Sequence, residues 1–122
     1  MEKLAQRALL VDFYGPLLTE KQRNVWDLHY QQDLSLTEIA EVENISRQAI
    51  HDLLKRTERI LSEYEDKLGL VERFWTERKK LMDVQTMLQG LSKADFSNPE
   101  VYKRYQSISV MIQDVFANIW EL

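Results

Sequence analysis

Cysteine is absent from this chain of 122 residues, so disulfide bonds and thiolate metal sites are excluded. Glycine occurs three times and proline twice, which favours long helices over a turn-rich sheet protein. No apolar run approaches the ~20 residues that cross a bilayer, and the N-terminal stretch lacks the cleavage site of a secretory signal. These absences predict a helical protein of the cytoplasm without membrane insertion.

A basic arm is also missing. The net charge is −4 and the sequence pI is about 5.2. Residues 1–62 carry eight Lys/Arg against ten Asp/Glu, and residues 63–122 carry the same numbers. Non-specific DNA binding depends on neutralising phosphates, so contact with DNA would require a local basic patch.

Groups that support catalysis are scarce. The two histidines, His29 and His51, belong to separate predicted helices and lack the H-E-x-x-H spacing of a zinc site. The chain has no glycine-rich phosphate loop and no G-x-S-x-G turn for a nucleophilic serine. We therefore expect a protein that is not an enzyme and has no catalytic residue, metal site or cofactor.

Apolar spacing predicts helices along most of the chain. The first covers residues 2–14, with Leu4, Ala8 and Val11 on its inward face, and Gly15-Pro16 ends it. A long helix follows later, from about Ser46 to Leu68, and would measure about 34 Å at 1.5 Å per residue. Gly69 is its expected end or bend.

Two short helices between these are marked by capping boxes, in which a hydroxyl and the side chain three residues later satisfy each other's backbone amides. The first box is T-E-K-Q, with Thr19 and Gln22, and the second is S-L-T-E, with Ser35 and Glu38. Asp33 closes the segment that the first box opens. The two boxes predict where two successive helices begin.

The stretch after Ser35 has the features of a helix-turn-helix motif. Ala40 is small enough for two helices to cross closely, and Asn44 tolerates the positive φ that the turn requires. Ile50 provides the apolar anchor of the second helix. The remaining expected core residues are Ile39, Ile45, Leu53 and Leu54.

The C-terminal part reads as an antiparallel helical hairpin. Its first helix covers residues 70–91, and Pro99 opens the second, with Ser97 or Asn98 as the cap. We expect a helix-turn-helix domain at 1–68 and a helical extension at 69–122 that packs on the long helix. Five large side chains exceed what a lone hairpin buries and must pack on the long helix or on another subunit: Trp75, Met82, Met87, Met111 and Trp120.

Residues 18–56, LTEKQRNVWDLHYQQDLSLTEIAEVENISRQAIHDLLKR, resemble the domain of bacterial sigma factors that reads the −35 element. The chain from MEKLAQRALLVDFYGPLLTEKQ through the FW at 74–75 closely resembles the YlxM family of small bacterial helix-turn-helix proteins. That family is usually encoded beside the protein components of the signal recognition particle. The resemblance implies an all-α fold: a sigma-factor-like helix-turn-helix bundle with a long fourth helix and a C-terminal helical hairpin.

The motif also predicts which side chains would meet DNA. The N-terminal part of the second motif helix would face base edges in the major groove. Flanking cations would meet phosphates. The candidate nucleic-acid-binding residues are Ser46, Arg47, Gln48, His51, Lys55, Arg56 and Arg59 on the long helix, with Lys21 and Arg23 before it.

This chain departs from the sigma-factor pattern on the surface that would face the groove. Sigma-factor recognition helices place several basic side chains there, whereas here His51 and Asp52 lie in that zone and Leu54 is apolar. Two functions therefore stay open. One is a DNA-binding regulatory protein of the signal recognition particle pathway, and the other is an adaptor that binds the particle's GTPase or RNA. Self-association into a homo-oligomer is a third expected contact.

Overall fold

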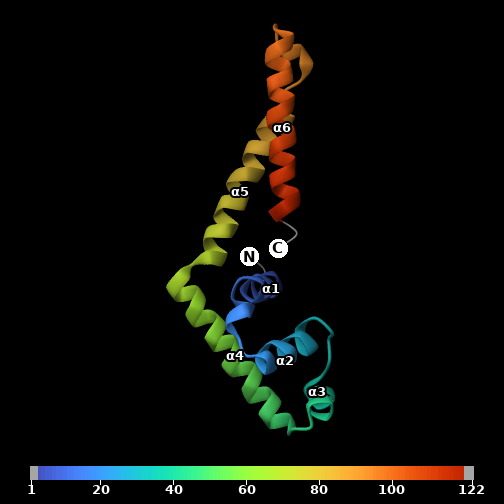
Figure 1. Cartoon of the computed structure of the whole chain (residues 1–122), viewed down its shortest axis with the longest axis vertical. Coiled ribbons are helices and arrows are strands. Elements are labelled where there is room, and N and C mark those ends of the chain that lie inside the picture. The colour runs from blue at the N-terminus through green and yellow to red at the C-terminus, as the bar shows by residue number, and fades with distance from the viewer. Residues whose placement is uncertain (1–2, 120–122) are drawn as a thin grey trace. The chain divides into compact units, whose positions relative to one another are not determined.

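The computed structural model describes residues 3–119, and this part of the chain contains helices but no strand (Figure 1). The all-α prediction is confirmed. Short 3-10 turns occupy Gly15–Leu17 and Lys93–Asp95. The six α-helices are α1 Lys3–Tyr14, α2 Glu20–Tyr30, α3 Leu36–Glu43, α4 Arg47–Leu68, α5 Leu70–Gln89 and α6 Pro99–Ile119.

The chain forms two compact units, Met1–Val71 and Glu72–Leu122. The first contains the helix-turn-helix motif, and the second contains most of α5 together with α6. The expected packing of the C-terminal extension on the long helix stays a prediction. Within residues 3–119, no helix is long and apolar enough to cross a membrane.

The local signals of the sequence place the helix ends correctly. Both capping boxes form: the Thr19 hydroxyl accepts the Gln22 amide at 3.2 Å, and the Ser35 hydroxyl accepts the Glu38 amide at 3.1 Å. Gly69 ends α4 with a left-handed φ of 62°, which glycine adopts without steric cost. The long fourth helix is therefore confirmed with its predicted boundaries.

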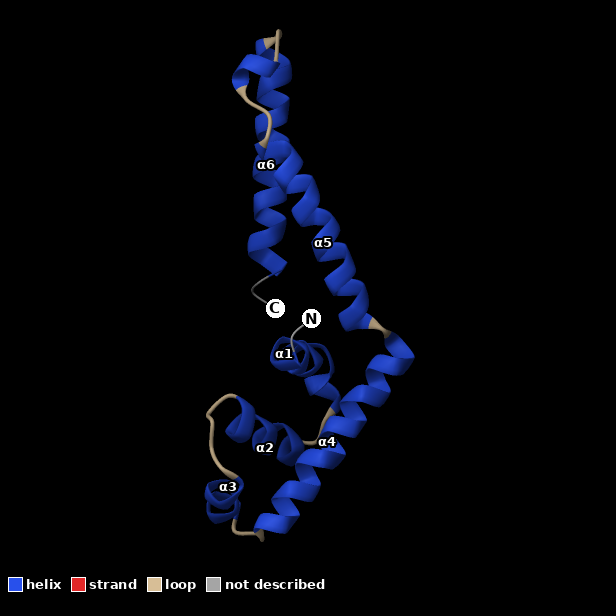
Figure 2. Ribbon diagram, turned by 180° about the vertical axis from the view of Figure 1, so that it is seen from behind, coloured by secondary structure: helices blue, strands red, loops and turns tan. Residues whose placement is uncertain are grey.

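The core of the first unit is built on one side of α4. Its buried stripe consists of Ile50, Leu54, Thr57 and Leu61, at the spacing of a single helical face. Helices α1, α2 and α3 all lie on that side of α4 in both Figure 1 and Figure 2. Residues from these helices that complete the core include Leu10, Tyr14, Val25, Trp26 and Ile39.

The inward face of α1 differs from the prediction. Leu4 and Ala8 are exposed and Val11 is half-buried, whereas Leu10 and Tyr14 are buried. The apolar residues of this helix allow either of two overlapping faces to be the buried one. Contacts with α4 select the one that carries Tyr14, and the expected face was therefore wrong.

Tyr14 anchors α1 to the junction of α4 and α5. Its hydroxyl donates a hydrogen bond to Glu65 Oε1 at 2.6 Å and accepts the Leu70 amide at 3.2 Å. The same carboxylate oxygen accepts the Val71 amide at 3.0 Å. Glu65 therefore satisfies an otherwise unpaired amide at the start of α5, where a negative charge is also favoured by the helix dipole. We call these groups the Tyr14–Glu65 joint.

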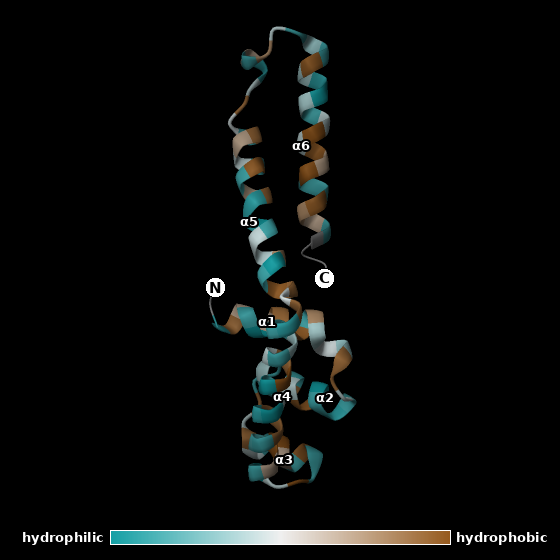
Figure 3. Ribbon diagram, turned by 90° about the vertical axis from the view of Figure 1, so that its left-hand side faces the viewer, coloured by the Kyte–Doolittle hydropathy of each residue, from teal (hydrophilic) through white to brown (hydrophobic). Residues whose placement is uncertain are grey.

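The second unit is the predicted antiparallel hairpin, with hydrophobic residues along both helices (Figure 3). Asn98, not Ser97, caps α6, because its side-chain oxygen accepts the Glu100 amide at 2.9 Å. Tyr105 of α6 shares its hydroxyl proton between the carbonyl oxygens of Leu88 and Leu91. Of the residues expected to need further cover, Met87 and Met111 are strongly exposed, and Trp120 lies outside the described residues.

Replacing Tyr14 with phenylalanine should lower the free energy of unfolding by about 1–3 kcal/mol, because the amide of Leu70 loses its acceptor and Glu65 loses a donor. Urea denaturation followed by circular dichroism measures the change. Tyr64→Phe is the matched control, since it removes a hydroxyl from the ring stacked 5.8 Å from Tyr14 and leaves the joint intact. Equal losses in both variants would contradict the role of the joint.

The joint also predicts a pH dependence. Burial raises the pKa of the Tyr14 phenol, and the hydrogen bond to Glu65 raises it further, since both favour the neutral form. The resulting stability is fully present below the unfolded pKa of about 10 and is lost as pH rises through the folded value. The wild-type chain should therefore lose stability above pH ~10 more steeply than Tyr14→Phe. Parallel curves for the two proteins would contradict this.

Candidate nucleic-acid interface

The helix-turn-helix motif rests on one left-handed residue. Asn44 adopts φ 55° and ψ 43° immediately after α3, which turns the chain toward α4. Ile45 donates its amide to the Ala40 carbonyl at 3.2 Å, and the Ser46 hydroxyl accepts the Ala49 amide at 3.1 Å to cap α4. Ala40 is half-buried at the crossing of the helices. The predicted turn is confirmed.

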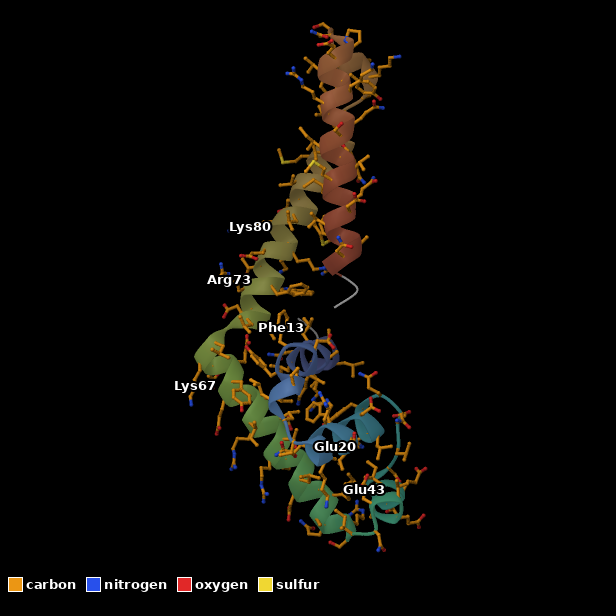
Figure 4. The ribbon with its side chains drawn as sticks, in the orientation of Figure 1. Phe13, Glu20, Glu43, Lys67, Arg73 and Lys80 are labelled. Carbon is orange, nitrogen blue, oxygen red and sulfur yellow. The ribbon has the colours of Figure 1, made fainter. Side chains whose placement is uncertain are left out.

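Every predicted contact residue is placed on the surface. Seven belong to α4 or its cap, and their exposure follows from the buried stripe on the opposite side of the helix. Figure 4 shows polar side chains projecting from the side of α4 away from α1, α2 and α3. The exposed residues are Ser46, Arg47, Gln48, His51, Lys55, Arg56 and Arg59, with Lys21 and Arg23 in the first turns of α2.

The expected core position of Leu54 is confirmed. Leu54 does not interrupt the exposed surface, because it is buried in the core beside Ile50. Asp52 does lie on that surface and is exposed. The periodicity explains the difference, since Leu54 follows Ile50 by four residues and therefore shares its buried face.

Asp52 organises its neighbours, which the sequence analysis missed. Gln48 Nε2 donates a hydrogen bond to Asp52 Oδ1 at 3.0 Å, and His51 Nδ1 lies 3.5 Å from the same oxygen. Asp52 also lines a shallow hollow of about 320 Å³ between α2 and α4. The i, i+4 spacing of Gln48 and Asp52 was the available signal. The hollow is lined by Lys21, Ile45, Ala49, Asp52, Leu53 and Arg56.

The balance of charge differs between the two motif helices. Among the described residues, no ion pair engages Arg47, Lys55 or Arg56, and Arg59 lies 3.8 Å from Glu63 at an exposed site. Such surface pairs contribute little free energy. Helix α3 instead exposes Glu38 and Glu41, and Glu43 is half-buried at its end (Figure 4). The exposed basic side chains of the candidate interface therefore lie on α4 and at the start of α2.

Comparison with known proteins agrees with this geometry. Residues 1–98 match a family described as "UPF0122: Putative helix-turn-helix protein, YlxM / p13 like". A UPF0122 protein of Desulforamulus reducens is 50% identical over 95 residues, which cover 78% of this chain and 81% of that protein. One from Bacillus mycoides is 46% identical over 108 residues, covering 88% and 96%. One from Clostridium kluyveri is 58% identical over 72 residues, covering 59% and 65%.

The family match covers most of the chain and includes all of α1 to α4, so the helix-turn-helix motif lies inside the shared region. The relatives from Desulforamulus and Bacillus extend the similarity over most of their own lengths. The chain therefore belongs to the UPF0122 family of YlxM/p13-like helix-turn-helix proteins.

Proposed function

We propose that this protein is a non-catalytic regulatory protein that binds DNA by placing the first half of α4 in the major groove. One observation carries the proposal: the αL turn at Asn44 and the buried stripe of α4 leave Arg47, Gln48 and Lys55 exposed together. Helix-turn-helix readers present the N-terminal residues of their second helix to base edges in this way.

The exposed side chains suit two kinds of contact. Arg47 has the donors to address guanine, and Gln48 has the amide to address adenine. Gln48 uses one amide hydrogen on Asp52, and its second hydrogen and its oxygen stay available for adenine. The cations that would meet phosphates are Lys55, Arg56 and Arg59 on α4 and Lys21 and Arg23 on α2.

Replacing Arg47 and Lys55 together with alanine should abolish DNA binding without unfolding the chain, since both side chains are exposed. Fluorescence anisotropy with genomic DNA fragments measures binding. For the wild-type chain we expect weak affinity at low salt that falls steeply with salt, because the net charge is −4. Each lost phosphate contact should reduce the salt slope by about 0.9.

The matched control removes the same two charges from the other unit. Arg73 and Lys80 are exposed on α5 and labelled in Figure 4, so Arg73→Ala with Lys80→Ala changes the net charge equally. This control should bind DNA like the wild-type chain. If Arg47→Ala with Lys55→Ala still binds, the assignment of α4 as the groove-reading helix is wrong.

Replacing Asp52 with asparagine should strengthen DNA binding. The carboxylate lies on the exposed side of α4 and opposes phosphates, whereas asparagine keeps an acceptor for Gln48. A unit charge near a phosphate in water costs about 1 kcal/mol, which corresponds to roughly fivefold in affinity. The gain should shrink as salt screens the charge. Weaker binding would show that Asp52 instead contacts DNA, as an acceptor for cytosine.

A second proposal concerns the signal recognition particle, and it follows from the resemblance to the YlxM family. The exposed acids of α3, Glu38 and Glu41, favour a protein partner on that helix over DNA. In this role the chain is an adaptor in protein targeting, and the acids of α3 favour the particle's GTPase over its RNA, whose phosphates they would repel.

Purified chain should then bind the reconstituted particle and change its GTPase rate at physiological salt. Arg47→Ala with Lys55→Ala provides the control, because an adaptor surface on α3 should survive a change confined to α4. If the particle neither retains the chain nor changes its rate, the adaptor role is rejected. Loss of both DNA binding and particle binding in this variant would indicate one shared surface.

A further inference from the structure

The hairpin of α5 and α6 buries too little to form a core of its own. Among the described residues after Val71, none is fully buried. The seam between the helices is half-buried and partly polar, since Gln85 and Ser109 lie in it beside Leu88 and Ile112. Its larger apolar members are Phe74, Leu81, Tyr105 and Phe116. Two helices packed by one seam leave most of their surface uncovered.

The register of the hairpin shows which exposed residues are neighbours. Gln85, Leu88 and Gln89 of α5 surround a small cavity together with Ser109, Ile112 and Gln113 of α6. Because the helices are antiparallel, this register places Val84 level with Val115 and Met87 level with Met111. Leu91, immediately after α5, is level with Ile108.

These six residues share one side of the hairpin. On α5, Val84 and Met87 flank the seam residues Leu81, Gln85 and Leu88 on one side, by the periodicity of the helix. On α6, the residues Ile108, Met111 and Val115 flank the seam residues on one side in the same manner. The opposite direction of α6 brings that row to the same side of the hairpin. We call this surface the methionine face: Val84, Met87, Leu91, Ile108, Met111 and Val115.

The methionine face contains no charged residue and has the area that a dimer requires. Its members are 40–75% exposed. This leaves roughly 600 Å² of these residues uncovered per copy, and complete burial of that area in a symmetric pair would remove about 1,200 Å² from water, the lower limit of specific interfaces. Scattered apolar residues need no explanation, but a contiguous patch of this size marks an interaction surface.

The two rows of this face are chemically alike. Read in the same direction along the hairpin, α5 presents Val84, Met87 and Leu91, and α6 presents Val115, Met111 and Ile108. A two-fold axis in the plane of contact and parallel to the helices brings like layers together and places four methionines at the centre. A surface that matches itself in this way suits the isologous contact of a symmetric dimer.

We propose that the methionine face binds the same face of a second copy of this chain, and that the two hairpins form a four-helix bundle. Burial on the partner supplies the second layer that each hairpin lacks. Methionine is suited to the centre, because its flexible thioether fills irregular gaps between helices. The proposal does not depend on DNA binding, since it concerns only α5, α6 and the segment between them.

The mass of the full-length chain tests this proposal by sedimentation or light scattering across the micromolar range. The wild-type chain should be a dimer, and Met87→Glu with Met111→Glu should raise the dimer dissociation constant by roughly 100-fold or more, because four carboxylates would enter an apolar layer. Met82→Glu is the matched control: Met82 is also an exposed methionine of α5, but it lies on the other side of the seam. This variant should stay dimeric. The wild-type chain and both variants should have the same helicity.

Cross-linking gives an independent readout, because the natural chain has no cysteine. In a mixture of the single variants Met87→Cys and Met111→Cys, a short thiol-reactive linker should join the two copies, whereas Met82→Cys should not be joined. A monomeric wild-type chain would overturn the proposal and leave the face to a different partner. A dimer that survives Met87→Glu with Met111→Glu, or that Met82→Glu disrupts equally, would overturn it as well.

Discussion

Burial of a single stripe on α4 is the constraint on which the first unit depends. Ile50, Leu54, Thr57 and Leu61 face α1, α2 and α3. The buried hydroxyl of Thr57 donates to the Leu53 carbonyl at 2.8 Å, so it is satisfied by its own helix. A helix that buries one stripe must expose the opposite one. The position of the candidate DNA-reading surface is therefore a consequence of core packing and of the turn at Asn44.

Local chemistry made much of this fold predictable. The capping boxes, the left-handed residues Asn44 and Gly69, and the proline that opens α6 each depend on neighbours within a few positions. The inward face of α1 and the Tyr14–Glu65 joint were not predicted. Tyr14 and Glu65 are separated by 51 residues, and a periodic pattern in one helix contains no information about which distant side chain it will meet.

The sequence predicted which residues belong to the candidate interface, but it predicted less about the contacts among them. Helical periodicity with the motif identified the exposed residues, from Arg47 to Arg59, and placed Leu54 in the core. The contacts of Asp52 with its neighbours were not predicted, because the charge of a carboxylate on a DNA-facing surface indicates repulsion from phosphates and does not indicate which side chains it meets. Its hydrogen bond with Gln48 shows that it also fixes the orientation of a candidate reading side chain.

The self-contained caps of α2 and α3 have a consequence for the order of folding. Each of these helices closes its first turn with a side chain only three residues away, so the start of each is set by a short stretch of its own sequence. Helix α1 has no such independence, because its partners Glu58, Tyr64 and Glu65 are synthesised about 50 residues after it. We therefore expect α1 to pack on α4 late in folding, after the whole of α4 has been synthesised.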